Sequence, residues 1–107
     1  MVIVSVLSFQ IIAQAKYVLV ESCTTKDGLV ELSIYSYEGG GSGYYKVTNN
    51  STKKLRVGFK YTSNEGRIHT GSTPVDSGKS EIGSCFDAGT KNTGIKSVDI
   101  IEVNNED

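Results

Sequence analysis

The sequence contains no tryptophan, a single histidine and only two cysteines. A zinc site requires three or more convergent ligands, and His69 cannot provide them if the two cysteines are bonded to each other, as predicted below. No Gly-x-Ser-x-Gly elbow accompanies the histidine, and no D-x-[DN]-x-[DN]-G calcium loop occurs. We therefore predict that the protein is not an enzyme and that it uses no metal and no cofactor.

Neither sign of charge dominates, because 11 lysines and arginines are balanced by 12 aspartates and glutamates, for a formal net charge of −1. The basic residues do not gather into the kind of stretch that contacts with phosphate backbones require. We expect neither nucleic acid nor an anionic membrane surface as a partner. Charged residues are 21% of the chain and the apolar residues fall into periodic segments, which argues against global disorder.

The N-terminal segment MVIVSVLSFQIIAQA carries no charged side chain. Its apolar run ends in Ala13-Gln14-Ala15, which is a typical signal-peptidase cleavage pattern. The run is shorter than the roughly 20 apolar residues of a membrane span. We predict an export signal over residues 1–15, a mature chain that begins at Lys16 without membrane insertion, and a secreted or periplasmic location. A buried first strand or helix is the alternative, and the lack of a basic segment before the run favours it.

Cys23 and Cys85 both follow the predicted cleavage site. An even number of cysteines in a small exported domain favours a disulfide. In the chain-entropy model, a bond that closes so long a loop stabilises the fold by about 4 kcal/mol. We predict a Cys23–Cys85 disulfide between the first strand and the penultimate strand, with two separate buried thiols as the alternative.

Apolar and polar residues alternate through most of the chain after residue 16, as is typical of half-buried β-strands. In KKLRVGFKY, for example, Leu55, Val57 and Phe59 form one apolar face. No segment after residue 16 has a sustained helical period, and turns rich in glycine and asparagine separate the strands. The doublet Ile100-Ile101 interrupts the alternation, which indicates a bulge or a doubly buried position. The predicted strands cover residues 17–23, 29–37, 44–48, 53–61, 67–70, 80–86 and 96–103.

Seven short strands in about ninety residues match an antiparallel β-sandwich, which we predict as a single domain over residues 16–107. The segments KVTNNSTKKLRVGFKYTSNEG and VDSGKSEI, within residues 45–85, resemble the middle of small immunoglobulin-like or fibronectin type III-like domains of exported bacterial proteins. The resemblance implies an immunoglobulin-like sandwich and specifies no function. The chain departs from antibody-type domains because it lacks tryptophan and places Cys23 on the first strand.

Two glycine patterns are best interpreted as turns. Residues 39–43, GGGSG, lie between two predicted strands, and no helix follows them to present its N-terminus to a phosphate. Gly78-Lys79-Ser80 resembles the end of a P-loop, but Thr73 occupies the position of the first glycine of that motif. Both patterns therefore predict loops without nucleotide binding.

Three tyrosines, Tyr35, Tyr37 and Tyr44, lie opposite the apolar faces of their own strands. If the strands on either side of the glycine loop form a hairpin, the three rings share the solvent side with Lys46. Exposed aromatic clusters on sheets commonly mark binding surfaces. We predict that these four residues contact a ligand. The alternative is that tyrosine is simply a good strand former whose ring covers its neighbours or packs on the second sheet.

These features predict an exported, non-enzymatic binding or structural module that recognises a protein or a carbohydrate. The alternative is a small secreted inhibitor or effector that acts through the loops at residues 38–44 and 86–95.

Overall fold

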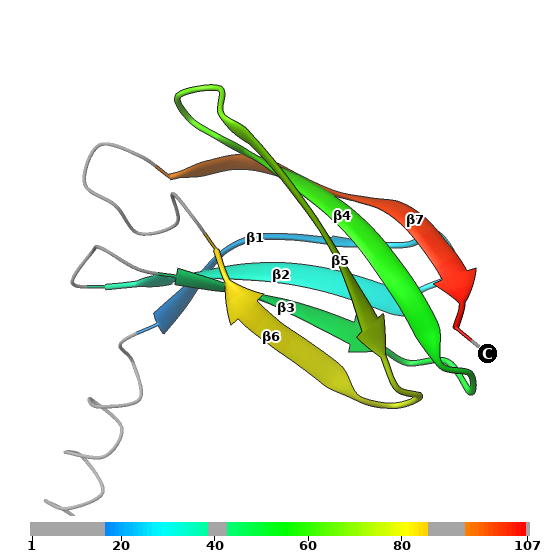
Figure 1. Ribbon diagram of the computed structural model, residues 1–107. Helices are drawn as coiled ribbons and strands as arrows, with labels where there is room; N and C mark the ends of the chain where they lie inside the picture. Colours follow the sequence, from blue (N-terminus) through cyan, green and yellow to red (C-terminus); the bar gives the residue numbers. More distant parts are fainter. Residues whose placement is uncertain (1–16, 39–42, 86–93, 107) are drawn as a thin grey trace, which may run out of the picture.

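The computed structural model describes residues 17–38, 43–85 and 94–106, which form seven strands in two facing antiparallel sheets (Figure 1). The predicted all-β architecture is confirmed. Within these ranges there is no helix of the length and apolarity that crossing a membrane demands. The strands are β1 (Tyr17–Thr24), β2 (Val30–Tyr37), β3 (Gly43–Asn49), β4 (Leu55–Ser63), β5 (Ile68–Val75), β6 (Ser80–Ser84) and β7 (Ile95–Asn105).

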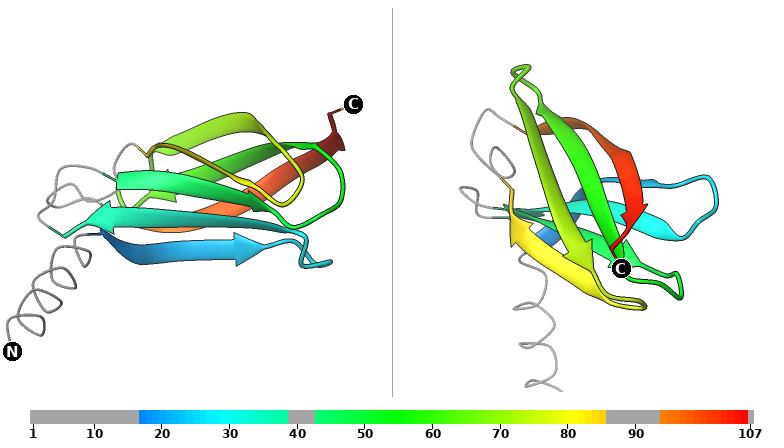
Figure 2. Two further views of the ribbon diagram at one scale, coloured as in Figure 1. Left: turned by 90° about the horizontal axis from the view of Figure 1, so that it is seen from below. Right: turned by 45° about the vertical axis from the view of Figure 1, so that its right-hand side comes forward.

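One sheet has the strand order β1-β2-β3-β6 and the other the order β5-β4-β7. Consecutive strands β1, β2 and β3 pair as a meander, and β4 and β5 pair in the other sheet. The chain passes from one sheet to the other after β3, after β5 and after β6. Figure 2 shows the two sheets as separate layers.

The core lies between the sheets and is built from the apolar faces that the alternation predicts. Val30, Leu32 and Ile34 alternate along β2 and are almost completely buried. The corresponding side chains of β4 face them from the other sheet. The buried hydrophobic residues are Val30, Leu32, Ile34, Val47, Leu55, Val57, Phe59, Tyr61, Val75, Cys85 and Val98.

Two aromatic rings of the core lie over glycines of the edge strands. Phe59 is directly opposite Gly71 across the β4–β5 ladder, and Tyr45 is directly opposite Gly83 across the β3–β6 ladder. A Cβ atom on either glycine would come within 3 Å of the opposite ring. The two ring centroids are 4.6 Å apart, so the rings pack on each other near the side of the sandwich where β5 and β6 are the edges.

Turn and bulge positions also agree with the sequence pattern. Gly28, Gly66 and Gly78 adopt positive φ angles of 77°, 89° and 70° in the predicted turns, a conformation that side-chain-bearing residues rarely adopt. Gly58 pairs with Glu102 and the next residue of β4 pairs with Ile100, which leaves Ile101 as the extra residue of a bulge. The interruption at the isoleucine doublet is therefore a β-bulge, as one of the two predicted alternatives requires.

Asn49, at the end of β3, fastens the turn that leads into the second sheet. Its side chain is fully buried. Nδ2 donates to the carbonyl oxygens of Lys53 at 2.8 Å and Val75 at 2.9 Å. Oδ1 accepts hydrogen bonds from the backbone N–H and the hydroxyl of Ser51. One side chain thus connects the β3–β4 turn with the end of β5.

The predicted Cys23–Cys85 disulfide is wrong, because these two residues belong to opposite edges of one sheet. Cys23 lies on β1 and Cys85 directly follows β6. Three strand spacings separate those edges, which amounts to about 14 Å, whereas a disulfide requires Cα atoms within about 7 Å. The cysteines do not form a disulfide, so the fold is stabilised without this covalent link. The predicted export signal, residues 39–42 of the glycine loop and most of the loop at 86–95 lie outside the described residues.

Candidate functional site

Four tyrosine side chains gather on the outer face of the four-stranded sheet. Residues directly opposite each other in an antiparallel pair share a face. Tyr35 is opposite Tyr44, and Tyr17 is opposite Tyr37. Their neighbour Ile34 points into the core, so the four rings point away from it. We call Tyr17, Tyr35, Tyr37 and Tyr44 the tyrosine face.

The rings of the tyrosine face contact one another. Tyr35 and Tyr44 are stacked, with centroids 4.9 Å apart and an interplanar angle of 19°. Tyr17 meets Tyr37 at 5.3 Å and Tyr44 at 5.2 Å in edge-to-face geometry. These distances lie in the range preferred by aromatic pairs. Tyr17 therefore connects Tyr37 to the stacked pair of Tyr35 and Tyr44, and the four rings form one continuous cluster.

The cluster lies on the surface but is only partly exposed, because the rings cover one another. Tyr17 is 44% exposed, while the other three rings are half-buried. Burial raises the pKa of the Tyr44 phenol, and the neighbouring Tyr35 and Tyr17 raise it further. The Tyr44 hydroxyl is therefore protonated at physiological pH and remains a hydrogen-bond donor.

Apolar side chains extend the tyrosine face to both edges of the sheet. Leu19 on β1 lies opposite Tyr35 and is 55% exposed. Ile82 on β6 lies opposite Lys46 and is 62% exposed. Ser33 on β2 lies opposite Lys46 across the β2–β3 ladder. It is buried although it points outward, so neighbouring side chains cover it. Among the described residues, the outer face of this sheet thus offers a broad apolar and aromatic surface that includes the cation Lys46, with the exposed carboxylate of Glu31 further along β2.

The structure unites the predicted site residues on one face. Tyr35 and Tyr44 are in direct contact, Tyr37 joins them through Tyr17, and Lys46 lies two residues after Tyr44 on the same strand face. Sequence reasoning missed Tyr17, Leu19 and Ile82. Their positions on this face depend on the β1–β2 and β3–β6 registers. Of the three, only Tyr17 could have been suspected from the sequence, because it is a further tyrosine in a predicted strand.

Other chemistry is sparse in the described part of the chain. His69 stacks on Tyr61 at 5.0 Å. Among the described residues, no three His, Cys, Asp or Glu side chains lie close enough together to hold a metal ion. Comparison of the chain with models of protein families, with curated proteins and with solved structures finds no match.

Proposed function

We propose that the chain is an exported, non-enzymatic binding module that recognises a protein partner through the tyrosine face. The observation that carries this proposal is the outward cluster of four tyrosine rings, flanked by exposed Leu19 and Ile82. Tyrosine is enriched in protein interfaces and among the residues that dominate binding energy. A contiguous exposed apolar surface is also uncommon on a protein that binds nothing.

The ring orientations favour a protein over a carbohydrate. A sugar stacks on the open, flat face of an aromatic ring. Tyr35 and Tyr44 each turn one face toward the other, and Tyr17 packs edge to face against two neighbours. The surface thus offers ring edges and hydroxyl groups across several strands, which suits a broad protein interface. A carbohydrate ligand is the alternative that the experiment below separates.

We also propose that the sandwich is immunoglobulin-like. In this interpretation β2, β3 and β6 correspond to strands A, B and E, and β5, β4 and β7 correspond to C′, C and F. The order of the sheets and the three crossings between them support this correspondence. The strand β1 is then an addition beside A, and no described strand takes the place of G beside β7. Export by residues 1–15 is part of the proposal, and N-terminal sequencing of the exported protein should begin at Lys16.

Binding measurements on matched variants test the proposed function. The chain is used to capture partners from its own envelope or secretome and is applied in parallel to a glycan array. Tyr35→Ala and Tyr44→Ala should each weaken the captured complex by roughly 1–2 kcal/mol, or about 5- to 30-fold in affinity. The control variant combines Lys60→Ala and Thr70→Ala, which lie opposite each other on the outer face of the second sheet.

The outcomes distinguish the alternatives. A protein partner whose affinity falls with the tyrosine variants and not with the control supports the proposal. A sugar that binds the array and is lost with the same variants identifies a carbohydrate-binding module instead. A partner that binds all variants equally, while their thermal stability is unchanged, excludes the tyrosine face as the binding site.

A further inference from the structure

The strand β7 forms an edge of its sheet, and part of that edge has backbone groups that are unpaired among the described residues. The N–H of Glu106 donates to the carbonyl of Lys54 at 3.0 Å. Because hydrogen-bonded pairs alternate along an antiparallel ladder, Asn104 is bonded to β4, whereas Val103 and Asn105 are in non-hydrogen-bonded pairs. The backbone N–H and C=O groups of Val103 and Asn105 therefore point away from β4, toward the open edge.

The opposite edge of the same sheet agrees with this alternation. Pro74 on β5 lies opposite Arg56 of β4, at a position where the alternation directs the missing N–H toward solvent. Proline is tolerated on an edge strand at such a position, and it blocks the addition of a further strand. β7 contains no proline, so the two edges of this sheet differ in their capacity to accept another strand.

The last part of the β7 edge is open. β1 packs against β7, with Cys23 of β1 near the backbone of Ile100, which influences the pKa of the Cys23 thiol. The bulge at Ile101 disrupts the regular spacing that a ladder needs. The segment from Val103 to Asn105 follows both features and is exposed.

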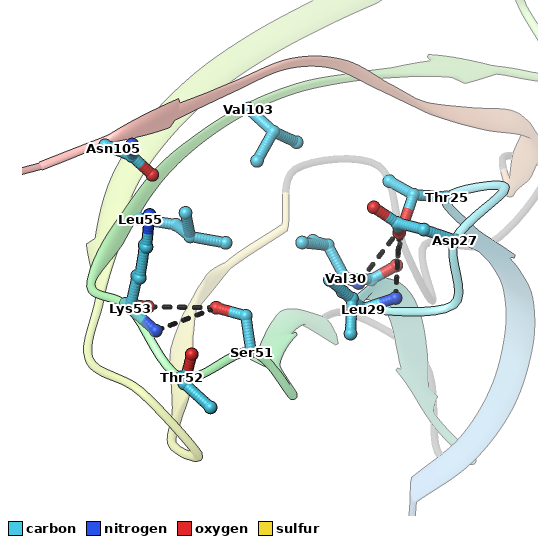
Figure 3. A pocket seen from close by; sticks show the side chains of 10 residues that line it. All are labelled: Thr25, Asp27, Leu29, Val30, Ser51, Thr52, Lys53, Leu55, Val103 and Asn105. Carbon is cyan, nitrogen blue, oxygen red and sulfur yellow. Dashed lines mark hydrogen bonds between the residues drawn. The ribbon is translucent and has the colours of Figure 1, made fainter.

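An apolar cavity of about 310 Å³ lies between the sheets beside this segment (Figure 3). Leu29, in the β1–β2 turn, and Val30 of β2 line it on one side, and Leu55 and Val103 line it from the other sheet. Leu29 and Val103 are 40% and 39% exposed, so the cavity has an apolar mouth open to solvent. A volume of this size accommodates a large aliphatic side chain.

The carboxylate at the rim of the cavity, that of Asp27, is hydrogen-bonded within the β1–β2 turn. The carboxylate of Asp27 accepts hydrogen bonds from the hydroxyl of Thr25 at 2.6 Å and from the N–H of Leu29 at 3.0 Å. These bonds lower the pKa of Asp27 and hold the β1–β2 turn that forms one wall of the cavity. Asp27 therefore has a structural role in shaping the cavity.

The outer face of β7 is acidic next to the open segment. Asp99 and Glu102 are exposed, and neither belongs to the ion pairs found among the described residues. A strand added beside β7 would place every second side chain on this outer face and the others toward the cavity. The two faces thus require basic side chains on one side of the added strand and aliphatic side chains on the other.

We propose that the open edge of β7 binds an extended segment of a partner protein in which basic and aliphatic residues alternate. The segment adds antiparallel to β7, pairs with the backbone of Val103 and Asn105, places an aliphatic side chain in the cavity and sets its basic residues beside Glu102. In such strand addition the backbone hydrogen bonds provide affinity and the side-chain pocket provides specificity. The site is on the sheet opposite the tyrosine face and does not depend on the function proposed for that face.

A synthetic nine-residue peptide of alternating leucine and lysine, capped at both ends, is the probe. Titrated into the full chain, it should slow amide hydrogen exchange at Val103 and Asn105 at least tenfold at saturation, with little change at Asn104. A matched peptide with glutamate in place of lysine should bind at least tenfold more weakly. Equal binding of the two peptides, or protection at β5 instead of β7, would overturn the proposal.

Proline substitutions provide the decisive variants. Val103→Pro removes an outward N–H without removing a ladder bond to β4, so it should leave the chain folded and weaken peptide binding at least tenfold. Ser72→Pro, at the equivalent outward position of β5, is the control and should leave peptide binding unchanged. If Val103→Pro fails to fold, Leu29→Lys at the cavity mouth replaces it and should also weaken binding at least tenfold. Undiminished binding to a folded Val103→Pro variant, or to Leu29→Lys in its place, excludes the site.

Discussion

Replacement of the buried Asn49 tests how the sandwich is held together at the passage from one sheet to the other. The Asn49 amide makes four hydrogen bonds, two donated by Nδ2 to Lys53 and Val75 and two accepted by Oδ1 from Ser51. Asn49→Asp keeps the size of the side chain. It replaces the donating NH₂ group by an oxygen that faces two carbonyl oxygens at 2.8 and 2.9 Å.

The expected loss is large for a domain of this size. Two net hydrogen bonds contribute about 1 kcal/mol each. Oδ1 keeps its two donors from Ser51, but burial of a second carboxylate oxygen that faces carbonyl groups and has no donor adds to the loss. We expect Asn49→Asp to lower the free energy of unfolding by about 3 kcal/mol at pH 7. Since 1 kcal/mol corresponds to about 4–8 °C in a small domain, the midpoint of thermal unfolding should fall by about 12–24 °C.

The pH dependence separates this mechanism from a simple loss of packing. Burial and the two carbonyl groups raise the folded-state pKa of the introduced carboxyl above its unfolded value of about 3.9. Between these two pKa values the folded state binds more protons than the unfolded state, so the variant loses stability as the pH rises through that window. Asn49→Ala should lose about 2–4 kcal/mol without this additional pH dependence, and it is the matched control.

Urea denaturation of both variants and the unaltered chain at pH 4 and pH 7 provides the measurement. The Asn49→Asp variant should differ less from the unaltered chain at pH 4 than at pH 7. A difference below 1 kcal/mol at pH 7, or the same difference at both pH values, would refute the role assigned to the Asn49 amide.

Three further predictions concern other parts of the fold. Without reductant, the denatured chain should take up two alkylating groups, because Cys23 and Cys85 form no disulfide, and a mass that shows one intact disulfide would contradict this expectation. In the folded chain Cys23 should react slowly at pH 7, since burial raises its pKa. Gly83→Ala should destabilise the fold by about 1–3 kcal/mol, because the new Cβ would meet the opposite aromatic ring, and unchanged urea unfolding would contradict the close approach. The hydrogen bond from Arg56 lowers the pKa of Glu106. The contribution of Glu106 to stability is therefore complete above its unfolded pKa and is lost as the pH falls through its folded pKa. Glu106→Gln should destabilise the fold at pH 7 and have no effect in strong acid, and an equal effect at both pH values would exclude this linkage.

Alternation in the sequence predicted the strands and their buried faces because each strand has one face in the core. The residues Leu55, Val57 and Phe59 lie inward as predicted, and the bulge occurs at Ile101 within the isoleucine doublet. β5 continues to Val75, well beyond the four residues predicted. The prediction was too short because glycine, serine and threonine follow one another in the second half of this strand, so hydrophobic alternation there is weak.

Strand order could not be predicted in the same way. Which strands become neighbours depends on contacts between distant segments, and alternation within one strand carries no information about them. The disulfide prediction was wrong for this reason: it assumed that the first and penultimate strands are adjacent, whereas β2 and β3 lie between β1 and β6. The same limit applies to the tyrosine face, where Tyr17 and Ile82 join only through the registers of β1 and β6.

Site-specific photo-cross-linking in the native host tests the central proposal most directly. A photoreactive phenylalanine analogue replaces Tyr44 in the tyrosine face or, as a control, replaces the exposed Thr70 on the outer face of the second sheet. The proposal predicts a discrete protein adduct from the Tyr44 position that excess unmodified chain competes away, and no such adduct from Thr70. A Tyr44 position that yields no protein adduct, or the same adduct from both positions, would contradict recognition of a protein partner through the tyrosine face.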